Sequence, residues 1–196
     1  MPNLINIQDK KVLIAHSDEV LLGELSGMLN AIGYSKVAEV SNLSDLKSQA
    51  LKNSPDLIVT GMDFADTKVI DTLIELAAED PLPSVIVAKK LELEDIEKAM
   101  EDHVFGYLVD PVYKEDLEST CYLVLRRFEQ FLELRLENIE LKEALVARKK
   151  IERAKGLIMK KYQLSEEESY LRIRKAATKR RIKLTEVADM IIEASV

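Results

Sequence analysis

The sequence contains a single cysteine, Cys121, and no long hydrophobic run. One thiol can form neither a disulfide within the chain nor a four-cysteine zinc site, which fits a reducing compartment. No apolar stretch approaches the roughly 20 residues that a membrane-spanning helix needs. The first residues show neither an apolar leader segment nor a twin arginine. We therefore expect a cytoplasmic protein that does not enter a membrane.

Arrangements typical of enzymes are also missing from the sequence. There is no pairing of a nucleophile with a base, no phosphate-binding loop and no cluster of residues at metal-ligand spacing. We therefore expect a chain that is not an enzyme and that has no catalytic residue, cofactor or metal site. The apolar fraction of 47% is ample for a core and excludes general disorder.

Charge is divided unevenly along the chain. The formal net charge is −7, yet residues 148–196 carry 14 Lys and Arg against 7 Asp and Glu, a net of +7. The first 147 residues therefore carry −14. A basic end on an acidic body favours an anionic partner for that end, nucleic acid first, although a solvated helical face would give the same count.

Residues 1–113 alternate between short apolar runs and amphipathic segments. The runs predict buried strands, and apolar residues at helical spacing predict helices between them, the first of which ends at Gly33. We expect strands at 12–15, 37–40, 57–60, 84–88 and 106–109, and helices at 19–32, 43–52, 67–78 and 93–100. This alternation implies an α/β fold with a parallel, doubly wound sheet.

The runs VLIA, PDLIV and GYLVDP resemble the landmarks of a response-regulator receiver domain. The resemblance implies a flavodoxin-like (βα)5 domain over residues 1–121. The positions where working receivers hold Mg²⁺ and handle phosphate carry unsuitable residue types: His16, Ser17, Gly61, Ala88 and Asp110. With Gly61 at the expected position of the phosphate-accepting aspartate, we predict a pseudo-receiver that has no phosphoacceptor.

Asp63 is the alternative acceptor. It lies two residues beyond Gly61, and Asp18 is expected near it, but the lysine and the hydroxyl that receivers also need are missing. Control is then expected from a regulatory protein or ligand that binds the pseudo-receiver. The loop around Phe64 is one candidate surface for such contacts, and His16 is expected to be solvated at a loop tip.

No Pro or Gly lies between Pro111 and Gly156, and this charged, leucine-rich stretch predicts one continuous helix. About 45 residues at 1.5 Å each give roughly 65 Å, which is too long to pack within one small domain. Apolar residues recur there at spacings of 3, 4, 4 and 3: Leu125, Phe128, Leu132, Leu136 and Ile139. We predict a coiled-coil segment over residues 122–144 that forms a parallel homodimer. The alternative is a single amphipathic helix folded back on the receiver.

Residues 145–196 carry a dispersed motif. It opens with L-x2-R-x2-I-x2-A-K-G-L-x-M, from Leu145 to Met159. It continues through these positions: Leu164, Ser165, Glu166, Tyr170, Ile173, Arg174, Ala177, Leu184, Val187 and Ala188. Together they resemble the ANTAR domain, a three-helix RNA-binding module of bacterial transcription antiterminators. Gln163 and Thr178 depart from the pattern of that family.

Capping residues predict where the helices of this segment begin. Ser165 and Glu168 would form a capping box at the second helix, and Thr185 would cap the third. Gly156 lies inside the first helix, where glycine costs about 1 kcal/mol relative to alanine, so we expect close helix packing or close approach of a ligand backbone there. The expected core is formed by these residues: Ile151, Ala154, Leu157, Ile158, Leu171, Ile173, Ala177, Val187, Ala188 and Ile191.

The resemblance implies contacts to RNA from groups outside this core. The candidates are Arg148, Lys155, Gly156, Tyr170, Arg174, Lys175, Lys179 and Arg180. The Tyr170 ring could stack on an unpaired base, although it could equally be wedged between helices. The implied function is transcription antitermination, in which the protein binds hairpins in nascent mRNA leaders so that a terminator does not form. A DNA-binding two-component response regulator and a protein-binding adaptor are the alternatives.

Overall fold

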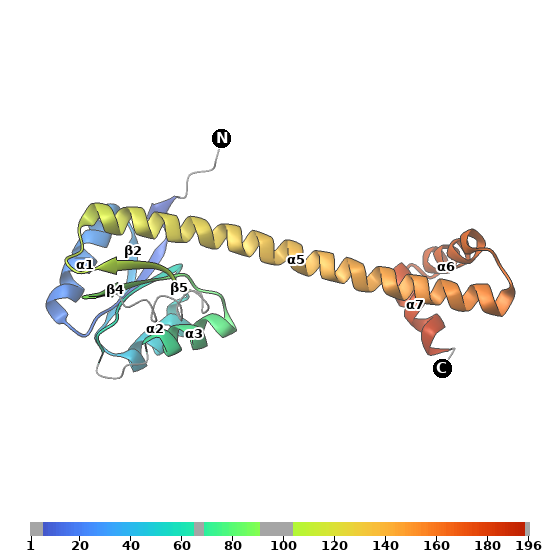
Figure 1. Cartoon of the computed structure of the whole chain (residues 1–196), viewed down its shortest axis with the longest axis horizontal. Helices are drawn as coiled ribbons and strands as arrows, with labels where there is room; N and C mark the ends of the chain where they lie inside the picture. Colours follow the sequence, from blue (N-terminus) through green and yellow to red (C-terminus); the bar gives the residue numbers. More distant parts are fainter. Residues whose placement is uncertain (1–5, 65–68, 91–103, 195–196) are drawn as a thin grey trace. The chain divides into compact units, whose positions relative to one another are not determined.

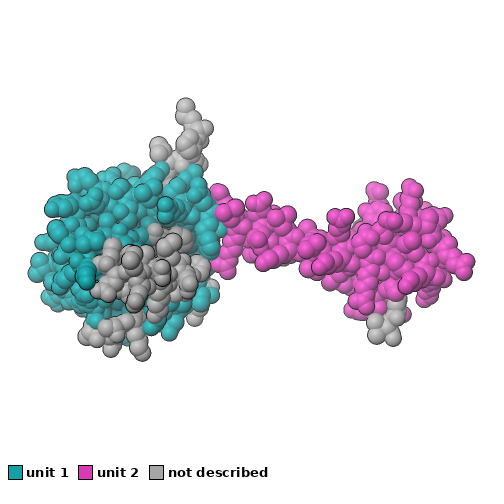
Figure 2. All heavy atoms as spheres, viewed as in Figure 1, with its two compact units in different colours: residues 1–131 teal, residues 132–196 magenta. Residues whose placement is uncertain are grey.

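The computed structural model describes residues 6–64, 69–90 and 104–194. Two compact units make up the chain, Met1–Phe131 and Leu132–Val196 (Figure 2). The helix predicted at residues 93–100 lies outside the described residues.

The first unit is built on a parallel sheet. In the described residues its strands are ordered β2-β1-β3-β4-β5, which is the order of a doubly wound fold (Figure 1). Their bounds are β1 Lys11–Ala15, β2 Ser35–Val40, β3 Leu57–Gly61, β4 Ser84–Ala88 and β5 Val104–Val109. Every residue of β3 and β4 is buried, which explains why these strands read as unbroken apolar runs. The predicted α/β receiver fold is confirmed.

Helices cover both faces of this sheet. One face packs against α1, Glu19–Ile32, and the first turns of α5, while the other packs against α2, Leu43–Asn53, and α3, Val69–Glu79 (Figure 1). The bounds of α1 match the prediction, and Gly33 ends it with φ of +111°. Asp18 caps its start, because the carboxylate accepts hydrogen bonds from the N–H groups of Val20 and Leu21.

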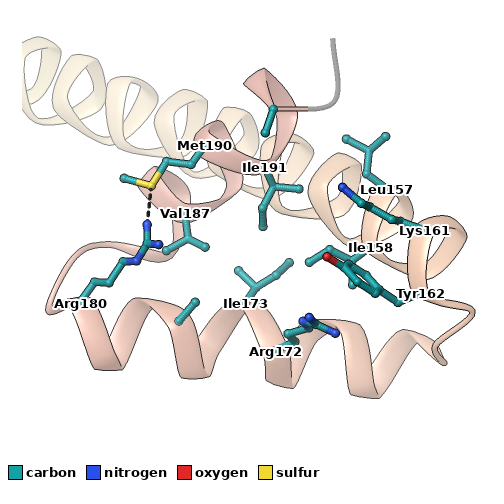
Figure 3. A pocket seen from close by; sticks show the side chains of 12 residues that line it. Leu157, Ile158, Lys161, Tyr162, Arg172, Ile173, Arg180, Val187, Met190 and Ile191 are labelled. Carbon is teal, nitrogen blue, oxygen red and sulfur yellow. Dashed lines mark hydrogen bonds between the residues drawn. The ribbon is translucent and has the colours of Figure 1, made fainter.

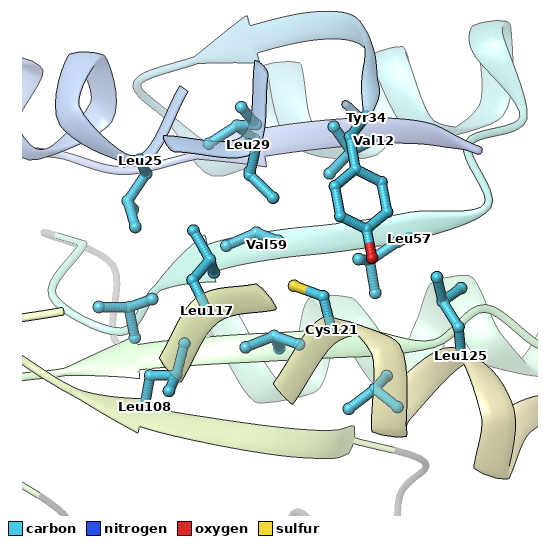
Figure 4. Packing of buried hydrophobic residues seen from close by; sticks show 14 of the residues in the cluster. Val12, Leu25, Leu29, Tyr34, Leu57, Val59, Leu108, Leu117, Cys121 and Leu125 are labelled. Atoms are coloured by element: carbon cyan, nitrogen blue, oxygen red, sulfur yellow. The ribbon is translucent and has the colours of Figure 1, made fainter. Parts of the chain in front are cut away.

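The core between the sheet, α1 and α5 contains the lone thiol of the chain. Cys121 is 0% exposed and lies near Leu117 and Tyr34 (Figure 4). Burial raises the pKa of this thiol to about 12. On the opposite face of the sheet, Phe64 is 8% exposed and packs in the core with Val69. The Phe64 ring is therefore not available as a contact group of that loop, because it packs over the sheet.

A single helix, α5, runs from Lys114 to Tyr162. Its continuity confirms the prediction drawn from the absence of Pro and Gly. Leu125 was predicted to lie in the coiled-coil seam. It is 3% exposed in the core of the first unit, so it is not available to that seam. Phe128 is half-buried and stacks with Phe131 at a centroid distance of 6.2 Å. Leu136, further along the same helix, is exposed.

The second unit is a small three-helix bundle. The end of α5 packs with α6, Glu166–Arg180, and α7, Leu184–Glu193. Its buried residues are Ala154, Ile158, Ile173, Ala177, Val187 and Ala188, as predicted. Leu171 is 42% exposed, so its predicted place in this core is wrong, because it lies on the outer side of α6.

The helices α6 and α7 each begin with a capping box, in which a glutamate three residues after the capping position accepts a hydrogen bond from the backbone N–H of that position. The predicted capping box of α6 is present, since the Ser165 N–H donates to the Glu168 carboxylate at 2.9 Å. The prediction for α7 is wrong by two residues. Its capping position is Lys183, whose N–H donates to Glu186 at 3.2 Å, and Thr185 lies inside the helix.

Candidate nucleic-acid interface

The exposed surface of α6 presents an aromatic ring and several cations. This helix buries Ser169, Ile173 and Ala177 against the rest of the bundle, which leaves the opposite side to solvent. Tyr170 is 41% exposed, and Arg174 follows it one turn later on the same side. The alternative of a ring wedged between helices is therefore excluded.

Two further cations extend this outer side. Lys175 and Lys179 are both exposed and form a second row with the same i, i+4 spacing. Arg148, on α5, is also exposed. We call Tyr170, Arg174, Lys175 and Lys179 the α6 face; exposed cations and a ring are the groups that contact RNA phosphates and unpaired bases.

Lys155 pairs with two carboxylates of the bundle. Its ammonium lies 2.6 Å from the Glu152 carboxylate and 2.8 Å from that of Glu166, and the residue is only 8% exposed. Hydrogen bonds to Glu152 and Glu166 raise the pKa of Lys155. The side chain thus joins α5 to the first turn of α6. Sequence reasoning missed this contact because it assigned Lys155 to RNA by charge.

Gly156 is not explained by packing within the chain. A Cβ built at this position would meet nothing within 4 Å. Close helix packing, one of the two explanations expected for this glycine, is therefore contradicted. The site is a bare stretch of α5 backbone next to Lys155.

Between them, the three helices leave a hollow of about 300 Å³ (Figure 3). Its floor is apolar, with Ile158 from α5 and Ile173 from α6. At one end the Arg172 guanidinium lies 4.0 Å from the centre of the Tyr162 ring, a cation–π contact. At the other end the Arg180 Nη1 donates to the Met190 Sδ at 3.1 Å.

Sequence reasoning placed Arg180 with the other basic residues of α6, and the structure places it at this hollow instead. It missed Tyr162 and Arg172 altogether. The one available signal was position: Tyr162 is the last residue of α5, and Gln163 follows with φ of +50°, a turn that brings the next helix back alongside.

The place of the receiver phosphorylation site is filled by an imidazole. His16 is 4% exposed, which corrects the prediction of a solvated loop residue. Its Nδ1 accepts a hydrogen bond from the Asp18 N–H at 2.9 Å. A Cβ at Gly61 would overlap the ring, with His16 Nε2 only 2.7 Å away. Burial lowers the pKa of His16, against the opposing effect of Asp18 and then Asp63, which favours the neutral ring.

Asp63 lies at the edge of the space that the His16 ring fills beside Gly61. The Ser17 hydroxyl donates to its carbonyl oxygen, and its carboxylate is 3.8 Å from the Lys89 ammonium. The pair is exposed and open to solvent screening. Whether Asp63 accepts phosphate stays a prediction, with the expected answer that it does not.

Two family models match the chain: the response regulator receiver domain over residues 12–121 and the ANTAR domain over residues 140–192. Transcriptional regulatory protein PdtaR of Mycobacterium tuberculosis is 30% identical over 184 residues, which cover 94% of this chain and 90% of PdtaR.

Solved structures resemble the first unit. A response regulator receiver domain protein from Clostridium thermocellum has a TM-score of 0.57 at 22% identity, covering 62% of this chain and 98% of that one. A two-component response regulator from Clostridium difficile has a TM-score of 0.56 at 23% identity, covering 61% and 98%. At these identities the likeness concerns the fold. Within the described residues, no helix is long and apolar enough to cross a bilayer.

Proposed function

Because the chain belongs to the family of transcription regulators that join a response regulator receiver domain to an ANTAR domain, we propose that it binds RNA hairpins as an antiterminator. Contacts to hairpins in nascent mRNA leaders would prevent formation of the terminator. The observation that carries this proposal is the α6 face, where the exposed Tyr170 ring and Arg174 form one row and Lys175 and Lys179 form a second row further round the helix.

The chemistry of the α6 face suits a folded transcript. Arg174, Lys175 and Lys179 would bind backbone phosphates, and Tyr170 would stack on an unpaired loop base, the usual way in which proteins read single-stranded RNA. Arg148 would add a phosphate contact from α5. The bare backbone at Gly156 leaves room for a sugar or phosphate to approach that helix closely.

The regulator would act as a parallel homodimer formed through α5. A long helix is expected to need a partner for its apolar residues, and several of these are exposed beyond the first unit: Leu134, Leu136, Ile139, Leu141, Leu145 and Val146. With Leu125 in the receiver core, the proposed seam begins at Leu132 and continues through Leu136 and Ile139. Each dimer would carry two RNA-binding units and could therefore hold two hairpins.

Control would come from a partner protein or ligand that binds the pseudo-receiver, since Gly61 stands at the position expected for the phosphate-accepting aspartate. Gly61 has no carboxylate, and the buried His16 ring occupies the space into which one would project. We propose no enzymatic activity for the chain.

The test is a binding titration of the full-length protein with hairpin RNA and with duplex DNA of matched length. The variant Arg174→Ala, combined with Lys175→Ala, should weaken hairpin binding and reduce the slope of log K against log salt by about one for each phosphate that is no longer neutralised. Lys52→Ala removes an exposed cation from α2 and serves as the matched control.

Tighter binding to duplex DNA than to any hairpin would favour the DNA-binding alternative. Equal RNA affinity of the double variant and the wild type would remove the α6 face from the interface. If neither nucleic acid binds at low ionic strength, the adaptor alternative gains and the proposal fails.

A further inference from the structure

The hollow between α5, α6 and α7 is separate in chemistry from the α6 face. It combines an apolar floor with a basic rim: Ile158, Ile173 and Val187 lie at the bottom, and Lys161 and Arg172 lie near the mouth (Figure 3). None of the side chains that line it, all within the described residues, is acidic. Such a lining favours an occupant that is both flat or apolar and negatively charged.

The size and geometry narrow the choice of occupant. At about 300 Å³ the hollow is at the lower end of the range for ligand pockets, so it suits a group the size of a single nucleobase. The Tyr162 ring is 46% exposed and carries the Arg172 guanidinium at 4.0 Å from its centre. An aromatic ring and a guanidinium plane are the two platforms on which unstacked RNA bases are held.

We propose that this hollow receives one unstacked base from the loop of the bound hairpin, with the phosphates on either side of that base contacting Lys161, Arg172 and Arg180. This inference rests on the proposed function and deepens it. The α6 face would bind the RNA backbone and one stacked base on the exposed surface of the helix. The hollow would accept the base at one loop position only if that base fits its volume. The bundle would thereby discriminate among hairpins whose stems present the same charge.

The experiment uses the full-length protein and a hairpin selected by it from an RNA pool with a randomised loop. Tyr162→Ala removes the platform, and its half-exposed ring is not part of the buried core. Ala176→Trp, on the wall of the hollow, fills the space without removing a cation. Tyr113→Ala, which removes another exposed tyrosine far along the sequence, is the matched control.

We expect both hollow variants to bind the selected hairpin about 5- to 150-fold more weakly, the range for loss of one base–aromatic stack. Tyr162→Phe, which keeps the ring, should restore binding, and Tyr113→Ala should match the wild type. One abasic loop position should weaken the wild type to the same degree and weaken Tyr162→Ala no further, because both changes remove the same contact.

The outcomes separate the two proposals. If the wild type selects no hairpin, the proposed function fails and this inference fails with it. If the wild type binds but Tyr162→Ala and Ala176→Trp bind equally well, the hollow holds no base while RNA binding stands. If the abasic and Tyr162→Ala effects add at every loop position, the base lies elsewhere. Circular dichroism melts establish that each variant is folded, and Tyr162→Ala alone decides the question if Ala176→Trp is not.

Discussion

Replacement of Gly61 by alanine tests whether the His16 ring fills the space beside Gly61, the position expected for a phosphate acceptor. The added Cβ would lie 2.7 Å from His16 Nε2 and 3.0 Å from its Cγ, where unstrained carbon contacts need about 3.5–4.0 Å. Neither group moves easily. His16 is 4% exposed and bonded to the Asp18 N–H, and the β3 backbone at Gly61 is paired with Val87 of β4.

An overpacked methyl of this kind costs about 1–3 kcal/mol of folding free energy. For a unit of this size, the melting temperature of the receiver transition should fall by roughly 3–10 °C. The double variant His16→Ala, Gly61→Ala should be less destabilised than the sum of its single variants, because the cavity left by the ring accepts the new methyl.

The assay is differential scanning calorimetry of the full-length protein, which resolves the receiver transition from that of the three-helix bundle if the two unfold separately. Gly23→Ala is the matched control. A Cβ there meets nothing within 4 Å and lies inside α1, so alanine should stabilise the unit by up to about 1 kcal/mol. A Gly61→Ala protein that melts at the wild-type temperature would refute the steric argument, as would full additivity in the double variant.

Two further outcomes are expected. Leu136→Asp, at an exposed position of α5, should convert the proposed dimer to monomer in sedimentation equilibrium without lowering the helix content, and a wild type that is monomeric at every concentration would refute the dimer itself. The pKa of Glu168 is lowered by the hydrogen bonds that it accepts from Ser165, so the capping box adds stability above the unfolded pKa near 4.5 and loses it as the pH falls through the lower folded pKa. The melting temperatures of Glu168→Gln and the wild type should therefore become equal at a pH below the folded pKa of Glu168. A difference in melting temperature that stays constant down to the lowest pH would contradict this assignment.

The receiver fold could be predicted from the sequence because each buried strand is an uninterrupted apolar run with a turn on either side. The bounds of α1 followed from helical spacing and from Gly33, whose φ of +111° only glycine adopts easily. The absence of a carboxylate at the expected acceptor position can be seen in the sequence alone, because Gly61 stands there. The burial of His16 could not be predicted from the sequence, because a polar residue after a strand is usually solvated. The neighbouring residues also do not indicate that Gly61, far away in the sequence, leaves space for the ring.

The interface was predicted less completely. Exposure of Tyr170 and Arg174 depends on which side of α6 faces the bundle, and the apolar positions of that helix did not settle it, since Leu171 was expected in the core and is 42% exposed. Lys155 and Arg180 were assigned by charge alone, yet they contact Glu166 and Met190, residues that lie 11 and 10 positions away in other parts of the bundle. Contacts of this kind depend on how helices turn back on one another, which residue type and spacing do not reveal.

The protected thiol of Cys121 makes the chain suitable for site-directed spectroscopy. With no exposed surface and a pKa near 12, this cysteine should not react with maleimide reagents at neutral pH while the protein is folded. A new cysteine placed at an exposed position can then carry a spin label or fluorophore without prior removal of the native one. Distances between identical labels on two copies would report directly how the α5 helices associate.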